Sequence, residues 1–309
     1  MAHLPLRIEW TSAPAALTAG RLKTLAPEIL VSSWSTPPLP EDWLADPECS
    51  LRYVCHLNGS VKALVPRRFI ERGGLVSNWG GMAAEPVAEH ALLLALAALR
   101  NLGGWPEAIR RGFGGEATCR LGTRSLFERR VGIHGFGAVV QSLMRLLRPF
   151  RVEARAYSQG VPESMFLREG VTPCSSLSEL FSWSEVLFEC EGLTPSSESS
   201  VDAAALAALP DGAVFVNVAR GRLVDEAALL REASSGRIRL ALDVVRDEPL
   251  SPESPLYRTR AAVLSPHIGG PTSDMYPGIG CFALANIARY VCEEKPEALV
   301  TPEIYDRAT

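Results

Sequence analysis

Short apolar segments that read as strands alternate with helical segments along most of the chain. In the first third, strand-like runs cover residues 29–31, 53–57 and 75–77, and residues 86–100 carry apolar side chains at helical spacing after Pro86. Parallel strands need long crossover connections, which are usually helices. This alternation therefore predicts an α/β protein with parallel sheets.

A second series of strands and helices follows a glycine-containing break at residues 101–104. Strands are predicted at residues 131–134, 153–157, 186–189, 213–218, 239–244 and 262–264. Helices are predicted at 138–147, 226–235 and 273–292. Asp225 can cap the second of these helices and Gly236 can end it. A chain of 309 residues with two such series predicts two domains.

Composition argues against several classes of protein. The net charge of -4 and the pI of about 5.8 disfavour a nucleic-acid partner. The apolar run at 91–99 is too short to span a bilayer, and residues 1–10 lack the apolar stretch of a secretory signal. Seven cysteines without a C-x-x-C pair argue against a disulfide framework and a zinc site. We expect a cytoplasmic protein with no metal and no membrane partner.

A glycine-containing turn joins the strand 131–134 to the helix 138–147. Two glycines stand where the amide groups of a helix N-terminus bind the pyrophosphate of a dinucleotide, although such a turn alone is also typical of ordinary tight turns. Val140 stands where close packing usually requires Gly or Ala, which predicts a helix set slightly farther from the sheet. The predicted cofactor contacts at this turn are Gly135, Gly137, Ala138 and Val139.

Ser158 stands at the end of the strand 153–157, where a carboxylate often binds the ribose 2′-hydroxyl of NAD. A carboxylate there also repels the 2′-phosphate of NADP, whereas a serine does neither. We therefore expect weak discrimination between NAD and NADP, with a slight preference for NADP because Arg155 lies in the same strand. His134 lies inside the preceding strand, and alternation predicts that it packs in the core.

Three chemically active side chains follow three successive predicted strands. Arg220 follows the strand 213–218, Asp243 ends the next strand, and His267 follows the strand 262–264, while Glu248 comes shortly after Asp243. The carboxyl ends of parallel strands meet at the edge of a sheet where ligands bind. The spacing thus predicts a cation, two carboxylates and an imidazole in one crevice.

Three segments around these residues resemble the D-isomer-specific 2-hydroxyacid dehydrogenase family. The segments read NVARGRLVDE at 217–226, LDVVRDEP at 242–249 and SPHIGGPT at 265–272. The resemblance runs from about Arg52 to the C-terminus. It implies an enzyme that transfers a hydride between NAD or NADP and a small D-2-hydroxy acid or 2-oxo acid, such as glyoxylate or hydroxypyruvate.

The resemblance also implies roles for individual residues. Arg220, Glu248 and His267 match the catalytic positions, and Asp243 matches the residue that holds the nicotinamide carboxamide. Further cofactor contacts are implied at Ser158, Leu193, Thr194, Val218, Ala219, Gly269 and Gly270. The implied substrate-binding positions are Asn58, Gly59, Ser60 and Val61, together with Arg220.

This chain departs from the family's pattern at three positions. Lys62 stands where the family commonly has Asp. This difference indicates either a variant subfamily or changed loop, or only a charged residue on the surface. Cys190 replaces the usual His at the start of the cofactor-side loop, and a backbone contact can survive that change. Trp79 replaces a common Thr, and it either covers the nicotinamide pocket or is an ordinary packed residue.

The residue types suit the implied chemistry. A guanidinium such as Arg220 can bind the carboxylate of a 2-oxo acid through two hydrogen bonds and polarise the neighbouring carbonyl. The imidazole of His267 can donate a proton to the developing alkoxide, or accept one in the reverse direction. Glu248 beside it would orient the ring and favour its charged form.

The resemblance implies a Rossmann nucleotide-binding domain at 102–275 inserted in a flavodoxin-like substrate domain made of 1–101 and 276–309, with the active site between them. It also implies a homodimer that uses residues 105–130. One alternative is a non-catalytic or weakly catalytic protein that senses nucleotides on the same fold. A formate dehydrogenase is a further alternative, but formate oxidation releases no alcohol proton for Glu248 and His267 to handle.

Overall fold

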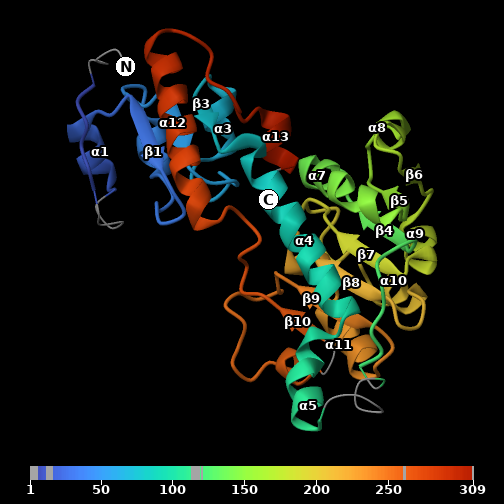
Figure 1. The fold of residues 1–309 in the computed structure, drawn as a ribbon. Helices are drawn as coiled ribbons and strands as arrows, with labels where there is room; N and C mark the ends of the chain where they lie inside the picture. The colour runs from blue at the N-terminus through green and yellow to red at the C-terminus, as the bar shows by residue number, and fades with distance from the viewer. Residues whose placement is uncertain (1–5, 12–16, 113–118, 120, 260–261, 308–309) are drawn as a thin grey trace. The chain divides into compact units, whose positions relative to one another are not determined.

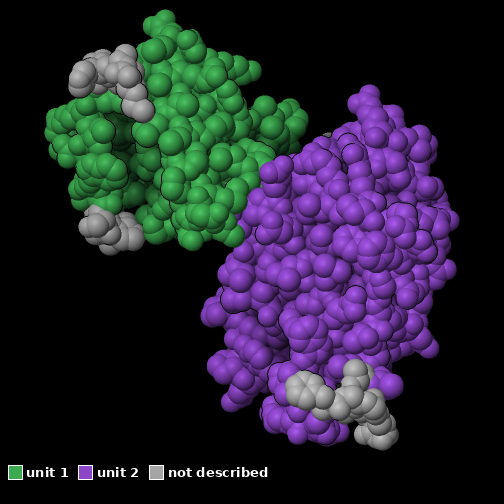
Figure 2. Space-filling model, viewed as in Figure 1, with its two compact units in different colours: residues 1–83, 272–309 green, residues 84–271 purple. Residues whose placement is uncertain are grey.

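The structure is a computed structural model that describes residues 6–11, 17–112, 119, 121–259 and 262–307. The chain divides into two compact units (Figures 1 and 2). Unit 1 comprises residues 1–83 and 272–309, and unit 2 comprises residues 84–271. Each unit contains a parallel sheet with helices, which confirms the predicted α/β class.

Unit 1 is built on a three-stranded parallel sheet with the order β1-β2-β3. Its strands are β1 (Ile29–Ser32), β2 (Tyr53–His56) and β3 (Leu75–Ser77), and its helices are α1 (Ala19–Leu25), α2 (Glu41–Ala45), α3 (Arg67–Glu71), α12 (Tyr276–Val291) and α13 (Pro302–Arg307). Tyr53 and Cys55 of the central strand pack against Ala283 and Ile287 of α12. Val54, which points to the other face, packs in a cluster formed by α1, α2 and α3.

Unit 2 contains a seven-stranded parallel sheet with the order β10-β9-β8-β7-β4-β5-β6. Its strands are β4 (Arg130–His134), β5 (Glu153–Tyr157), β6 (Thr172–Pro173), β7 (Val186–Glu189), β8 (Val214–Asn217), β9 (Arg239–Leu242) and β10 (Ala262–Leu264). Its helices are α4 (Ala84–Leu99), α5 (Trp105–Arg110), α7 (Ala138–Leu147), α8 (Glu163–Arg168), α9 (Leu177–Trp183), α10 (Ala203–Ala208) and α11 (Glu226–Ser234). The strand order reverses between β4 and β7, and ligands bind at such a reversal in open α/β sheets.

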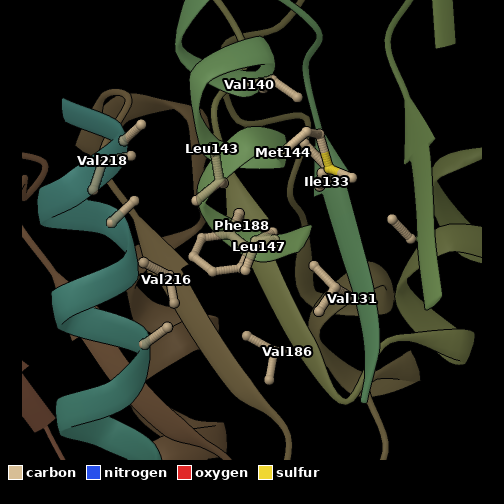
Figure 3. Close-up of a cluster of buried hydrophobic side chains, with 14 of the residues drawn as sticks. Val131, Ile133, Val140, Leu143, Met144, Leu147, Val186, Phe188, Val216 and Val218 are labelled. Carbon is tan, nitrogen blue, oxygen red and sulfur yellow. The ribbon is translucent and has the colours of Figure 1, made fainter. Parts of the chain in front are cut away.

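The two faces of this sheet carry separate hydrophobic cores. Val131 and Ile133 of β4 point into a cluster that includes α4 and α7, as Figure 3 shows. Leu187 of β7 belongs to the second cluster, which is formed with α9, α10 and α11. Val140 of α7 is fully buried in the first cluster, so the contact between helix and sheet accommodates this larger side chain. Helices on both faces make the sheet doubly wound, as predicted.

Helix α4 is a core helix of unit 2. Ala88 and Ala95 are fully buried, and the helix packs against α7, β8 and β9. Because this packing ties α4 to the larger sheet, unit 2 begins at residue 84, whereas the sequence predicts the boundary after the helix, at residue 102. The second boundary lies after residue 271, close to the predicted position.

By length and composition alone, the segment Gly80–Leu99 could cross a membrane. The most apolar window of this segment is 44% buried inside the protein, and its helical part supplies side chains to the core in Figure 3. This packing agrees with the interpretation of the segment as a buried helix.

The two glycines of the turn after β4 differ in backbone conformation and in the space around them. Gly135 has φ +93°, and a Cβ at this position would lie 2.5 Å from the backbone nitrogen of Glu191. Gly137, the N-cap of α7, has φ -119°, and a Cβ there would meet no atom of the described residues within 4 Å. The first glycine is therefore required by the fold, while the second leaves open space at the helix N-terminus.

Alanine at these two glycines should have different effects on stability. We expect Gly135→Ala to lower the free energy of unfolding by about 1 to 3 kcal/mol or more, because the variant must keep a positive φ and displace the Glu191 backbone. Gly137→Ala meets no obstacle and should change that free energy by less than about 1 kcal/mol. Urea unfolding followed by circular dichroism measures both values, and equal losses in the two variants would contradict this account.

Candidate functional site

The turn predicted to bind the cofactor lies at the N-terminus of the ten-residue helix α7. Its N-cap is Gly137, a residue without a side chain that could bind the first amides of the helix. The amides of Ala138 and Val139 belong to the first turn, where the N–H groups of a helix have no acceptor within the helix. These amides, the helix dipole and the open space at Gly137 together suit the pyrophosphate of a dinucleotide.

Arg220 is positioned by the polar end of β8. The side-chain amide of Asn217 donates to the carbonyl oxygen of Arg220 (3.1 Å), and its side-chain oxygen accepts from the amide of Ala219 (3.0 Å). Gly221 allows close packing, because a Cβ there would overlap the backbone of the loop after β9. That loop carries Glu248. Burial lowers the pKa of the Arg220 guanidinium, and the nearby charge of Glu248 opposes this shift.

His267 and Glu248 form a close polar pair at this edge of the sheet. The Nδ1 atom of His267 lies 2.6 Å from Oε2 of Glu248, and Oε1 of Glu248 accepts from the amide of Val245 (3.2 Å). The two side chains are 46% and 37% exposed, so a ligand can reach them. Because Nδ1 faces the carboxylate, Nε2 is the ring nitrogen that can exchange a proton with a substrate.

Asp243, which follows β9, is a buried carboxylate with four protein partners. Its Oδ1 atom accepts from the Ser265 hydroxyl (2.7 Å) and the Ile268 amide (2.9 Å), and its Oδ2 atom accepts from the Gly269 amide (2.8 Å). The Nε2 atom of His90 lies 3.2 Å from Oδ1. Burial raises the pKa of the Asp243 carboxyl, but these hydrogen bonds outweigh burial and lower the pKa to about 2.

The backbone of Asp243 also holds the segment that carries His267. The backbone carbonyl oxygen of Asp243 accepts from the His267 amide (2.9 Å), and His267 adopts φ +54°. The resemblance assigns Asp243 to the nicotinamide carboxamide, and that contact stays a prediction. Of the two carboxylate oxygens, Oδ2 has the fewer protein partners and therefore the greater remaining capacity to accept a hydrogen bond.

His90 is a member of this network that the sequence did not reveal. It lies on α4, and its Nε2 atom is 2.8 Å from the Ser265 hydroxyl, which itself donates to Asp243. The one signal in the sequence is an imidazole within the apolar helical pattern of residues 86–100. A polar side chain on a core helix needs a hydrogen-bond partner, but the partner cannot be identified without the fold.

The other predicted cofactor contacts lie around the ends of β7, β8 and β10. The Val218 amide donates to the carbonyl oxygen of Glu189 (3.4 Å). Leu193 packs against the cluster formed with α9, α10 and α11, and the Thr194 amide is bonded within its own loop. Among the residues that the structure describes, no atom lies within 4 Å of where a Cβ at Gly270 would stand, so this backbone also borders open space.

His134 is buried, as predicted, but it also has a charged partner. Its Nδ1 atom lies 2.6 Å from Oε2 of Glu189 on the neighbouring strand β7, and Glu189 is fully buried. Burial lowers the pKa of His134, but the charge and hydrogen bond of Glu189 outweigh burial and raise it. This pair joins the ends of β4 and β7, next to the turn at Gly135.

The predicted substrate-binding residues form the loop after β2 in unit 1. Asn58 is buried, and its side-chain oxygen has no hydrogen-bond partner among the described residues. The carbonyl oxygen of Gly59 accepts from the side chain of Asn78 (2.7 Å). Within the described ranges, the amides of Gly59, Ser60 and Val61 donate no hydrogen bond. Three such amides at the end of a parallel strand suit the binding of a carboxylate.

Aromatic side chains border this loop. Trp34 makes edge contacts with His56 and Trp79, with ring centroids 6.0 and 6.1 Å apart. A Cβ on Gly59 would lie 3.1 Å from Nε1 of Trp79, so Trp79 packs against the loop. Burial lowers the pKa of His56 to about 4, and its Nδ1 atom is 2.9 Å from the Ser32 hydroxyl. His56 is therefore a neutral, structural residue.

The structure brings the predicted residues together in two groups. Arg220, Asp243, Glu248 and His267 lie at the carboxyl ends of β8, β9 and β10, which are neighbours in the sheet of unit 2. The loop at residues 58–61 lies at the carboxyl end of β2 in unit 1.

Comparisons with known proteins agree with this arrangement. The model of the "D-isomer specific 2-hydroxyacid dehydrogenase, NAD binding domain" family matches residues 92–269. A D-3-phosphoglycerate dehydrogenase of Mycobacterium bovis is 33% identical over 207 residues, which is 66% of this chain and 38% of that protein. The human glyoxylate reductase/hydroxypyruvate reductase is 30% identical over 231 residues, covering 72% of this chain and 69% of that protein.

A solved structure extends the similarity over both units. The glyoxylate reductase from Paecilomyes thermophila superimposes with a TM-score of 0.78 and 25% identity, covering 92% of this chain and 87% of that one. This chain belongs to the D-isomer specific 2-hydroxyacid dehydrogenase family, and residues 92–269 are its NAD-binding domain. The match spans well under half the length of the mycobacterial relative.

The Asp243 network predicts a pH-dependent contribution to stability. The pKa of the Asp243 carboxyl is about 2 in the folded protein, below the value of an unperturbed aspartate, and this difference stabilises the folded state by about 2 kcal/mol. The contribution is complete above about pH 4 and is lost as the pH falls towards 2. We therefore expect Asp243→Asn to lower the free energy of unfolding by about that amount at pH 7. Urea titrations at several pH values measure the difference, with the exposed Asp247→Asn as control.

The deficit of Asp243→Asn should narrow below pH 4, because the wild-type carboxyl then takes up its proton. A carbon NMR titration can measure the pKa of the Asp243 carboxyl directly. A pKa near 4, or a variant as stable as Asp247→Asn at pH 7, would contradict the network described above.

Proposed function

We propose that this protein is an NAD(P)-dependent oxidoreductase that interconverts a small 2-oxo acid and the corresponding D-2-hydroxy acid. The observation that carries the proposal is the His267–Glu248 pair, 2.6 Å apart, in the same edge of the sheet as Arg220. The named relatives that reduce glyoxylate and hydroxypyruvate support this class of substrate.

Arg220 binds and polarises the substrate. Its planar guanidinium can form two parallel hydrogen bonds with a carboxylate, or bridge the carboxylate and the adjacent carbonyl oxygen. The bound dihydronicotinamide supplies the hydride in the reducing direction. The amides of Gly59, Ser60 and Val61, which donate no hydrogen bond within the described part of unit 1, also suit a carboxylate.

His267 is the proton donor in the reducing direction. The substrate oxygen on carbon 2 gains negative charge as the carbonyl is reduced, and Nε2 of the charged ring donates a proton to it. Glu248 accepts a hydrogen bond from Nδ1 and thereby fixes the orientation of the ring. In the oxidising direction the neutral ring accepts the hydroxyl proton from the same oxygen.

We also propose that the protein is a cytoplasmic homodimer without a nucleic-acid or membrane partner. The net charge of -4 supports the absence of a nucleic-acid partner. Support for a dimer through residues 105–130 comes from large apolar side chains that are exposed in this segment. Trp105, Ile109 and Phe127 are 42%, 56% and 48% exposed.

Replacing the proton donor tests the function. We expect His267→Ala to lower kcat for reduction of the best 2-oxo acid about 10²- to 10⁴-fold, because general acid catalysis typically contributes that much. The affinity for reduced cofactor should stay close to the wild-type value, since the imidazole has no part in binding the pyrophosphate. Steady-state kinetics with a panel of 2-oxo acids, and fluorescence titration with NADH and NADPH, measure the two quantities.

The exposed neighbour Asp247→Asn is the control and should leave both values unchanged. A loss in kcat of less than about tenfold for His267→Ala would exclude this residue as the proton donor. A wild-type protein that binds cofactor but reduces no acid in the panel would favour the alternative function, a nucleotide-sensing binding protein.

A further inference from the structure

The carboxylate of Glu191 lies next to Ser158, although the end of β5, which Ser158 follows, has no acidic residue at this position. The Ser158 hydroxyl donates to Oε2 of Glu191 (2.7 Å). Glu191 comes shortly after β7, whereas Ser158 follows β5, and β4 lies between these two strands in the sheet. The Glu191 side chain therefore reaches across the end of β4 to the edge of β5.

The turn at Gly135 makes this crossing possible. The backbone of residues 190–191 passes so close to the turn that a Cβ on Gly135 would be 2.5 Å from the Glu191 nitrogen. The Glu191 amide is also fixed, because it donates to Oε1 of the buried Glu189 (2.9 Å). The position of the Glu191 carboxylate thus follows from the same contacts that shape the dinucleotide-binding turn.

The Glu191 carboxylate can still accept further hydrogen bonds. Its Oε1 atom accepts from the Gly192 amide (2.9 Å), and its Oε2 atom accepts from Ser158. A carboxylate has about four acceptor positions, so each oxygen retains one. Both Glu191 and Ser158 are partly exposed, which leaves these positions open to a ligand.

Arg155, the cation that favours NADP in the sequence, is engaged elsewhere. Its guanidinium carbon lies 4.4 Å from the centre of the Trp183 ring, and its Nη2 atom is 3.5 Å from a carboxylate oxygen of Glu153. Glu153 is the first residue of β5, and Ser158 follows the opposite end of that strand. Arg155 thus stacks on Trp183 and pairs with Glu153 at the start of β5.

We propose that Glu191 is the residue that selects the cofactor, by accepting the ribose hydroxyls of NADH and repelling the 2′-phosphate of NADPH. In dinucleotide-binding sheets this function belongs to an acidic residue about 20 positions after the glycine turn, where this chain has Ser158. Glu191 provides the same charge from a different strand, and Ser158 positions it. This inference rests on the proposed NAD(P)-dependent function, and it replaces the expected weak discrimination with a preference for NADH.

The test compares cofactor affinities, which do not depend on turnover. Fluorescence titration gives Kd for NADH and NADPH with the wild-type protein, Glu191→Gln and the control Glu153→Gln. The glutamine keeps the shape and one acceptor oxygen, while the control removes the same charge from the other end of β5. We expect the wild type to bind NADH at least about tenfold more tightly, and Glu191→Gln to reduce that preference about tenfold through tighter NADPH binding.

Glu191→Lys provides a second measurement, because an ammonium group should attract the 2′-phosphate and favour NADPH. Thermal unfolding of each variant checks that the fold is retained. An unchanged ratio in both Glu191 variants, or an equal gain in affinity for the two cofactors, would overturn the inference while leaving the proposed function intact. A change in the NADH to NADPH affinity ratio of Glu153→Gln would also overturn the inference. A wild-type protein that binds neither cofactor would refute the proposed function as well.

Discussion

The buried carboxylate of Asp243 is the interaction on which the candidate active site depends. A buried charge without partners costs several kcal/mol, so the chain around it must present hydrogen-bond donors. Ser265 and the amides of Ile268 and Gly269 do this, and His90 on the core helix α4 completes the set. Because Ser265, Ile268 and Gly269 flank His267, their hydrogen bonds to the buried carboxylate also fix the backbone that presents the imidazole to Glu248.

Much of the fold, and the grouping of Arg220 with His267, could be predicted because local sequence signals such as helix caps and strand ends agree with the tertiary structure. Asp225 caps the N-terminus of α11, where its side chain accepts from the Ala228 amide (2.9 Å), and Gly236 follows the helix with φ +78°. Arg220 and His267 could be placed together because the ends of adjacent parallel strands meet at one edge. The short elements β6, α8, α9 and α10 were not predicted, since a few residues carry little periodicity.

The rest of the site depends on contacts between distant parts of the chain, which periodicity cannot reveal. The Ser158–Glu191 hydrogen bond joins residues 33 positions apart on different strands, so no local pattern around Ser158 predicts it. Likewise, no local pattern predicts that the Arg155 guanidinium stacks on Trp183. The start of unit 2 at residue 84 depends on a similar long-range contact, because only the packing of α4 shows to which sheet the helix belongs.

The central claim is that the protein reduces carbon 2 of a 2-oxo acid with a hydride from the nicotinamide and a proton from His267. The most direct measurement uses reduced cofactor carrying deuterium at the transferred position, with proton NMR and chiral chromatography of the product. We expect a D-2-hydroxy acid with deuterium on carbon 2. A product without deuterium at that carbon, or the L isomer, would contradict it.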